Sequence, residues 1–599
     1  MIAYTGKYAV VDLSDGSIQV RDTPFEWVRK YYGGKGLVFR YLAGELPPSV
    51  DPLGPDNQLV LAASPLTGTI APCSGKLTVG SKSPATGTIL DCSVGGGFAA
   101  QLKYAGYDFL AVRGKAPHPV YLFIDDGDIT VRPASDLWGK GTRETDSALR
   151  SELGLDISVI GIGPGGENMV RFACLTADVY RQAGRGGAGA VAGSKNLKAV
   201  AVRGSRAVRV PHGRKFLDRI REIVWEAVLG PDNDWAISDG TPVLVDLCHT
   251  IGVLPTRNFQ EGTFEDHEKI NTDRVKAHLK QRRACFGCPL ACGSYVDVGG
   301  WRVEGPEYET LAMGGSNCGI SDFGAIVRFN KMCDDLGLDT ISTGNVLGFA
   351  MESTERGVRD YGLRFGDTQA YLKAVEDIAL RRGVGELLGQ GVRYLGENFG
   401  GYDFAMHVKG LEMPAYDPRG SWAMALAYAT ADRGADHLRA WAIAQEAMAG
   451  MDPFTGEGKP ELVADLQWKN AAKWSVGVCD SCSMSPEILA ELLSLATGWS
   501  LTGATDIVRA GKRIWLLGRL FNVREGFRRR EDTLPVRVFE HPVRGGPADG
   551  VVVPRATFEE MLDRYYVLMG WDREGVPTRE AIEECALESE VVVAFRKLP

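Results

Sequence analysis

The chain has 599 residues, of which 44% are hydrophobic and 24% are charged, and its formal net charge at pH 7 is −9. That length exceeds what one hydrophobic core supports, and the composition is typical of a globular protein with several domains. The acidic balance argues against nucleic-acid binding, no apolar run reaches the ~20 residues of a membrane helix, and the start lacks a signal-peptide pattern, so we expect a cytoplasmic protein with reduced cysteines.

Residues 1–207 are predicted to form a β-rich domain. Tyr8 to Val20 alternates apolar and polar side chains around Asp15-Gly16, a dipeptide that is typical of hairpin turns. Val120 to Val131 repeats this pattern around Asp126-Gly127. Two hairpins are therefore expected in this domain.

Beyond about residue 210 the pattern becomes helical. Phe216 to Val228 and Tyr371 to Leu380 place apolar residues at the i, i+3, i+4 spacing of a helix. Ser485-Pro486-Glu487 predicts a helix start, and Gly498 predicts the end of that helix. We divide this part into two mainly helical domains, residues 208–406 and 407–599.

The most specific chemical signal is a cysteine triple, Cys285, Cys288 and Cys292. Three thiolates so close together can hold one centre, and an iron–sulfur cubane needs a fourth, commonly distant, cysteine. Either Cys479 or Cys482 could supply it. A structural zinc site is the main rival, but zinc prefers paired C-x2-C knuckles. The C-x2-C-x3-C spacing also differs from the C-x3-C-x2-C motif of radical-SAM enzymes. A further, weaker alternative is that the cysteines are core residues without a ligand.

Other parts of the chain must hold the reacting group, since a cluster only transfers electrons. Glycine clusters at residues 95–97, 161–166 and 184–189 could present backbone N–H groups to phosphates, although each alone is more often a tight turn. The isolated cysteines are instead expected to be small core residues: Cys73, Cys174, Cys248 and Cys585.

Taken together, nearly the whole chain resembles the aldehyde:ferredoxin oxidoreductase family of tungstopterin enzymes. The matching segments are Tyr31–Gly36, Ser83–Gly87, Gly184–Ala190, Leu254–Phe259, the cysteine triple, Gly305–Thr310, Gly337–Thr340, Asp432–Arg439 and Arg519–Phe527. The resemblance implies an α+β protein: an N-terminal domain of two β-sheets that form a pterin-binding saddle, followed by two mainly α-helical domains. It also implies tungsten (or molybdenum) bound by two pyranopterins, a [4Fe–4S] cluster, and Mg²⁺ between the pterin phosphates.

The family's functional residues carry over position by position. The resemblance assigns Cys479 as the fourth cluster ligand, with Cys482 as the alternative. It assigns these residues to the pterins and their magnesium: Lys76, Ser93, Gly95, Gly96, Arg185, Gly186, Asp334, Gly337, Leu338, Asp339, Arg439, Gly477 and Val478. Three positions depart from the family pattern: Lys76 replaces Arg, Ser93 replaces Asn, and Trp474 replaces the acid that opens the second pterin-binding segment.

The implied reaction is oxidation of an aldehyde to a carboxylic acid, with electrons leaving through the cluster to ferredoxin. His437 and Glu309, with Glu307 as the alternative carboxylate, are predicted to handle protons, because His titrates near neutrality and burial raises the pKa of Glu. Two other functions stay open: the tungsten subunit of a class II benzoyl-CoA reductase, and an iron–sulfur electron-transfer subunit without a pterin. The family's intersubunit metal motif has no counterpart near residues 325–333, so a homo-oligomer is left open.

Overall fold

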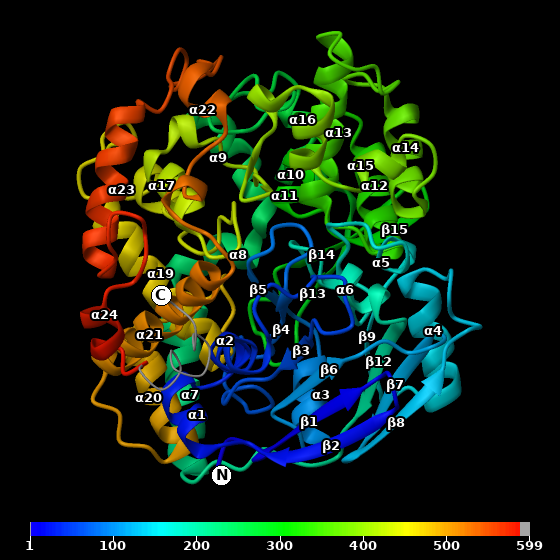
Figure 1. Cartoon of the computed structure of the whole chain (residues 1–599), viewed down its shortest axis with the longest axis vertical. Coiled ribbons are helices and arrows are strands. Elements are labelled where there is room, and N and C mark those ends of the chain that lie inside the picture. Colours follow the sequence, from blue (N-terminus) through cyan, green and yellow to red (C-terminus); the bar gives the residue numbers. More distant parts are fainter. Residues whose placement is uncertain (1, 588–599) are drawn as a thin grey trace.

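The computed structural model describes residues 2–587 and contains two six-stranded sheets near the N-terminus. Figure 1 shows these strands in the centre and lower right, with helices of the middle region above them and later helices on the left. The expected fold, two sheets followed by mainly helical regions, is confirmed. Within residues 2–587 we find no helix with the length and apolarity needed to cross a membrane.

Both sheets are mixed. The first has the order β2-β1-β6-β3-β4-β5, and β1 runs parallel to β6. The second has the order β11-β10-β9-β12-β7-β8, and β7 runs parallel to β12. The first sheet consists of β1 (Lys7–Asp12), β2 (Ser17–Asp22), β3 (Leu59–Ala62), β4 (Leu77–Lys82), β5 (Ile89–Val94) and β6 (Phe109–Arg113). The second consists of β7 (Val120–Asp125), β8 (Asp128–Pro133), β9 (Ser158–Gly161), β10 (Leu175–Ala177), β11 (Arg181–Ala183) and β12 (Leu197–Arg203).

Apart from the exposed edge strand β2, the first sheet is buried on both faces. In β1, Ala9 and Val11 join a core shared with the second sheet, whereas Tyr8 and Val10 face the core of the helical regions. This follows from the period of two residues in a strand, which sends neighbouring side chains to opposite faces. The sheet thus separates two hydrophobic cores, and loops at its edges can reach the helical part of the molecule.

The predicted local elements are present. Hairpins join β1 to β2 at Asp15-Gly16 and β7 to β8 at Asp126-Gly127. The helix predicted after Ser485 is α20 (Pro486–Thr497): the Ser485 side chain accepts from the N–H of Ile488, and Gly498 ends the helix in the left-handed conformation. The longest other helices are α2 (Gly34–Glu45), α4 (Thr142–Leu153), α7 (Gly213–Ile223), α12 (Phe323–Leu336), α13 (Thr340–Glu355), α14 (Thr368–Leu380), α19 (Lys459–Val476), α21 (Ala504–Arg524) and α23 (Arg555–Met569).

Two helices end against the N-terminal domain in the same way. Gly337 ends α12 and Gly477 ends α19, both with positive φ. A Cβ at Gly337 would lie 2.8 Å from the backbone N of Gly163, and one at Gly477 would lie 2.7 Å from Cβ of Ser64. Glycine is therefore required at both ends, for backbone conformation and for close approach.

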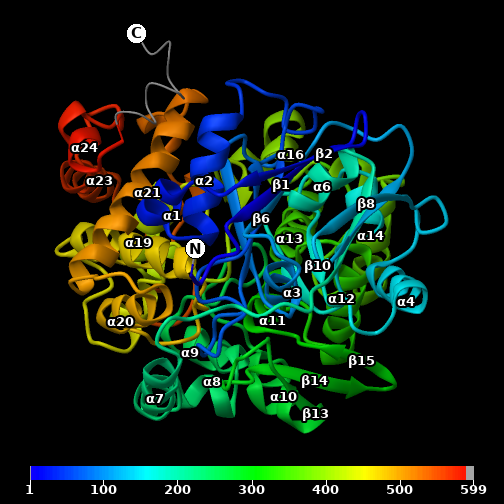
Figure 2. The ribbon, with the colours of Figure 1, turned by 90° about the horizontal axis from the view of Figure 1, so that it is seen from below.

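A third, smaller sheet lies in the region that was expected to be mainly helical. It consists of β13 (Leu279–Arg283), β14 (Gly293–Val298) and β15 (Trp301–Glu304), and the cysteine triple occupies the connection between β13 and β14. Figure 2 shows this sheet at the lower edge of the molecule, the edge that also carries α7. This small sheet was not predicted, because long-range pairing, and not local periodicity, creates it.

Candidate active site

Four predicted ligands surround one cavity. Cys285, Cys288, Cys292 and Cys479 all line it, although Cys479 follows α19, far along the chain. The N–H of Cys479 donates to the carbonyl of Cys73 at 3.0 Å, which holds the remote cysteine at the site. Cys482 instead interacts with the thiol of Cys73. This arrangement favours Cys479 as the fourth ligand.

Cys73 was expected to be an ordinary core residue, and it is indeed buried. Its sulfur, however, lies 3.7 Å from that of Cys288. This contact lowers the pKa of the Cys288 thiol to about 6 against the effect of burial. Cys73 thus adjoins a predicted ligand, which no short motif in the sequence indicates.

Two cationic side chains, Lys76 and Arg181, line the same cavity. Burial lowers the pKa of Lys76, but the nearby acidic groups Cys479, Asp480 and Cys285 outweigh it, so the pKa lies above its ordinary value. The pKa of Arg181 is raised in the same way by Cys285. Arg181, which also forms an ion pair with Glu304, escaped the sequence analysis because no local pattern marks it.

Glycines let the cysteine loop approach β5. A Cβ at Gly95 would lie 2.5 Å from the sulfur of Cys285, and one at Gly75 would lie 2.8 Å from the carbonyl oxygen of Phe286. Gly96 has a φ of +95°, and its carbonyl accepts from the N–H of Phe286 at 3.2 Å. The structure therefore places Gly95 and Gly96 directly against the cysteine loop.

A short segment leads from the cysteine cavity to the predicted pterin-binding residues. Arg181 lines the cavity, and the amide of Gln182 donates to Asp334 at 2.9 Å. Arg185 donates to the carbonyl of Ala435 at 2.7 Å and lies 3.8 Å from Asp339. Arg181 and Arg185 are four residues apart, and four residues of extended chain span at most about 14 Å. The cysteine cavity and the predicted pterin-binding residues therefore adjoin.

The first predicted pterin-binding segment lies beside this connection. Asp334 is half-buried, and desolvation raises its pKa well above the ordinary value. Asp339 accepts from the N–H groups of Ile341 and Ser342 and caps α13. Leu338, between them, is buried. In the structure both carboxyl groups thus have structural partners already.

On β5, Ser93 follows Cys92, whose thiol donates to the carbonyl of Arg185 at 3.3 Å. The carbonyl of Gly186 accepts from the hydroxyl of Ser83 at 2.7 Å. The two segments that were predicted to share a magnesium ion are therefore neighbours in space.

The second predicted segment adjoins a buried charge network. Arg439 donates to Asp432 at 2.7 Å and to Asp91 at 2.5 Å, and Lys35 also binds both carboxylates. The guanidinium of Arg439 lies 4.9 Å from the ring centre of Trp474. Gly477 and Val478, three and four residues further along the chain, are buried. Arg439 is thus held by protein carboxylates, and Trp474 contacts a cation.

His437 and Glu309 are brought together as predicted: His437 Nε2 lies 3.5 Å from Glu309 Oε1. Burial lowers the pKa of His437 to about 3, with Asp436 opposing this and Arg185 adding to it. Burial raises the pKa of Glu309 to about 8, against the hydrogen bond from Ala415. Both groups are therefore largely neutral at pH 7, and the contact is not an ion pair. The group that titrates near neutrality is Glu309, and not the histidine as expected.

Three buried polar atoms near this pair have no hydrogen-bond partner: Glu309 Oε1, His437 Nδ1 and Arg185 Nε. Buried polar groups are nearly always hydrogen-bonded, and leaving one unpaired costs about 1–3 kcal/mol. Their presence on three separate segments fits a polar group that binds among them. The four thiols with their two cations likewise fit an anionic iron–sulfur cluster.

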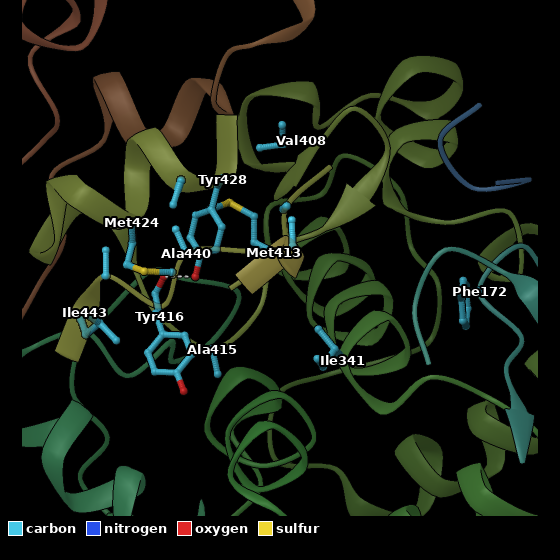
Figure 3. Close-up of a cluster of buried hydrophobic side chains, with 14 of the residues drawn as sticks. Phe172, Ile341, Val408, Met413, Ala415, Tyr416, Met424, Tyr428, Ala440 and Ile443 are labelled. Carbon is cyan, nitrogen blue, oxygen red and sulfur yellow. Dashed lines mark hydrogen bonds between the residues drawn. The ribbon is translucent and has the colours of Figure 1, made fainter. Parts of the chain in front are cut away.

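An apolar wall adjoins the pair. Figure 3 shows Tyr416, Tyr428, Met413 and Met424 gathered near Ala415, whose N–H donates to Glu309 at 3.0 Å. The hydroxyl of Tyr428 donates to the carbonyl of Tyr416 at 3.1 Å. The ring of Tyr416 also lies 5.6 Å from that of His437. This wall lowers the local polarity around the two titratable groups.

This fold is that of an oxidoreductase family. The description "Aldehyde ferredoxin oxidoreductase, N-terminal domain" matches residues 8–204, and "Aldehyde ferredoxin oxidoreductase, domains 2 & 3" matches residues 229–587. The chain belongs to the aldehyde ferredoxin oxidoreductase family, which confirms the resemblance seen in the sequence.

Named relatives extend over the whole chain. The tungsten-containing aldehyde ferredoxin oxidoreductase of Pyrococcus furiosus is 41% identical, with 97% of this chain and 98% of the relative covered. An aliphatic sulfonate oxidoreductase, WOR-like subunit, of the same organism is 31% identical over 98% of this chain and 97% of its own. A solved structure, the active site complex BamBC of benzoyl coenzyme A reductase with 1,5 dienoyl-CoA, has a TM-score of 0.85 and 25% identity, and covers 100% of this chain and 99% of its own.

Proposed function

We propose that this protein is a tungsten bis-pterin oxidoreductase that oxidises aldehydes to carboxylic acids and passes the electrons through a [4Fe–4S] cluster to ferredoxin. The observation that carries the proposal is the segment from Arg181 to Arg185, which joins the four-thiol cavity to the unpaired polar atoms around His437. Relatives described as tungsten-containing favour tungsten over molybdenum.

The groups are assigned to residues as follows. Cys285, Cys288, Cys292 and Cys479 would hold the cluster, and Lys76 and Arg181 would balance its charge. Mg²⁺ would lie between the backbones at Ser93 and Arg185. The pterins would contact the remaining predicted residues: Gly95, Gly96, Gly186, Asp334, Gly337, Leu338, Asp339, Arg439, Gly477 and Val478.

Oxidation of an aldehyde with water gives a carboxylic acid, two protons and two electrons. When bound, the metal–pterin group accepts the electron pair, and the cluster carries the electrons away one at a time. The ionised form of Glu309, which is the minor form at pH 7 because the pKa is about 8, can take a proton from water at its unpaired Oε1. The neutral His437 can donate a hydrogen bond to the aldehyde oxygen, and the apolar wall around Ala415 limits bulk water.

The test is metal analysis followed by a substrate comparison. We expect about one tungsten and four iron atoms per chain, and reduction of a viologen dye that depends on benzaldehyde. Iron without tungsten or molybdenum would instead support an electron-transfer subunit. Dienoyl-CoA oxidation without aldehyde oxidation would support a benzoyl-CoA reductase-like function, for which the structural similarity to BamBC is the specific observation.

A further inference from the structure

A groove on the surface adjoins the cysteine loop. Its wall includes Ile70, Tyr104, Val208, Phe216 and Phe286, and we call it the Phe286 groove. Ile70 leaves 53% of its surface exposed and lines the same groove as these other apolar side chains, so it belongs to an apolar patch and does not stand alone on the surface. The groove is thus a largely apolar surface at the edge that carries α7 (Figure 2).

The groove lies next to the predicted cluster. Phe286 directly follows Cys285 and precedes Cys288 by two residues, so one side of the groove is the cysteine loop itself. Gly287 and Pro289 in the same loop are exposed. A molecule seated here would therefore be separated from the cysteine cavity by little more than this loop.

The other side of the groove is basic, in contrast to the chain as a whole. Residues 203–228 contain seven Arg or Lys and three Asp or Glu, whereas the net charge of the protein is −9. Within this segment Arg214 exposes 91% and Arg221 exposes 68% of the side chain, and Lys215 is also exposed. Local positive charge on an acidic protein attracts an acidic partner and orients its approach.

We infer that the Phe286 groove and its basic rim on α7 form the docking site for a small acidic iron–sulfur electron carrier. This inference rests on the proposed function, because it assigns the exit point of the electrons. One electron leaves the cluster beside Cys285 and enters the carrier's cluster: the first is oxidised, the second is reduced, and no bond forms or breaks. Apolar contacts at Ile70 hold the partner, and Arg214 and Lys215 speed its arrival.

The test compares two double charge reversals in the metal-loaded enzyme. In Arg214→Glu/Lys215→Glu, we expect KM for an acidic [4Fe–4S] ferredoxin to rise about tenfold at low salt, since rim charges govern association. The difference should vanish near 1 M salt, where the screening length is about 3 Å. The control, Arg530→Glu/Arg579→Glu, reverses two similarly exposed charges and should stay close to wild type. Arg579 begins α24 (Arg579–Glu584), which lies at the upper left in Figure 2, away from the lower edge that carries α7.

A third variant, Ile70→Asp, should raise the ferredoxin KM at both low and high salt, because it removes apolar contact as well as adding charge. In all variants, reduction of the cluster by aldehyde, followed by EPR without any external acceptor, should match wild type. Wild-type enzyme that shows no such reduction would refute the proposed function. Unchanged ferredoxin kinetics in both groove variants, or an equal loss in the control, would overturn the docking site.

Discussion

Replacing Glu309 by Gln should slow aldehyde oxidation and, in the cofactor-free protein, increase stability at alkaline pH. Glutamine retains an oxygen that can accept from the N–H of Ala415, now 3.0 Å from the carboxylate, and it has nearly the same volume. It cannot ionise, however. General acid–base catalysis typically contributes 10²–10⁴-fold, so we expect turnover to fall by about 10²-fold or more.

The effect on stability follows from the pKa of Glu309, which burial raises from 4.5 to about 8. Below pH 4.5 the group is protonated in both folded and unfolded chains, and its ionisation costs nothing. Between pH 4.5 and about pH 8, Glu309 ionises in the unfolded chain but keeps its proton in the folded chain, so the stability of the wild type falls as pH rises. The difference corresponds to at most about 5 kcal/mol, fully developed above pH 8. The Gln variant lacks this loss.

The assay is the melting temperature of cofactor-free protein between pH 4.5 and 9, combined with turnover and metal content of loaded enzyme. Glu309→Gln should melt higher than wild type at pH 8 and equally at pH 4.5, with normal tungsten and iron. Glu307→Gln is the matched control, because Glu307 is the neighbouring carboxylate and bonds to Thr241. Wild-type turnover in the Glu309 variant, or a loss confined to the Glu307 variant, would refute the reasoning.

Three further outcomes are expected around the cysteine cavity. Cys73→Ala should keep the cluster but lower its reduction potential by a few tens of millivolts in EPR-monitored titration, because a ligating Cys288 thiolate can only accept a hydrogen bond, and the thiol 3.7 Å away would no longer be there to donate one. Cys479→Ser should lose iron or leave a three-iron species, whereas Cys482→Ser should retain four iron atoms; the reverse pattern would make Cys482 the ligand. Gly95→Ala should lower iron content, since its Cβ would lie 2.5 Å from the sulfur of Cys285, and full iron loading would contradict that geometry.

Local signals in the sequence predicted local structure well. Asp15-Gly16 forms a hairpin turn because that dipeptide suits the turn itself, and Ser485 and Gly498 bound α20 through contacts within a few residues. The sheet of β13 to β15 was not predicted. Its strands are short, charged and interrupted by the cysteine loop, so their pairing depends on contacts that no local window contains.

In the candidate site, too, the sequence predicted what neighbouring residues determine and missed what long-range contacts determine. The cysteine triple was found because its ligands lie in one short loop. Cys73 and Arg181 were missed because they reach the cavity from separate parts of the chain. The acid–base roles needed the structure too, since burial sets the pKa of Glu309 and His437 and spacing carries no information about burial.

The distance in sequence between Cys292 and Cys479 has a consequence for how the protein survives heating. A group bound to all four thiols would cross-link the chain across roughly 190 residues. Closing a loop of that size lowers the conformational entropy of the unfolded chain and so raises its free energy by about 5 kcal/mol. Iron loading would then link the segment around Cys292 to the segment around Cys479. Resistance to proteolysis in both regions should appear together when iron is added and disappear together when it is chelated.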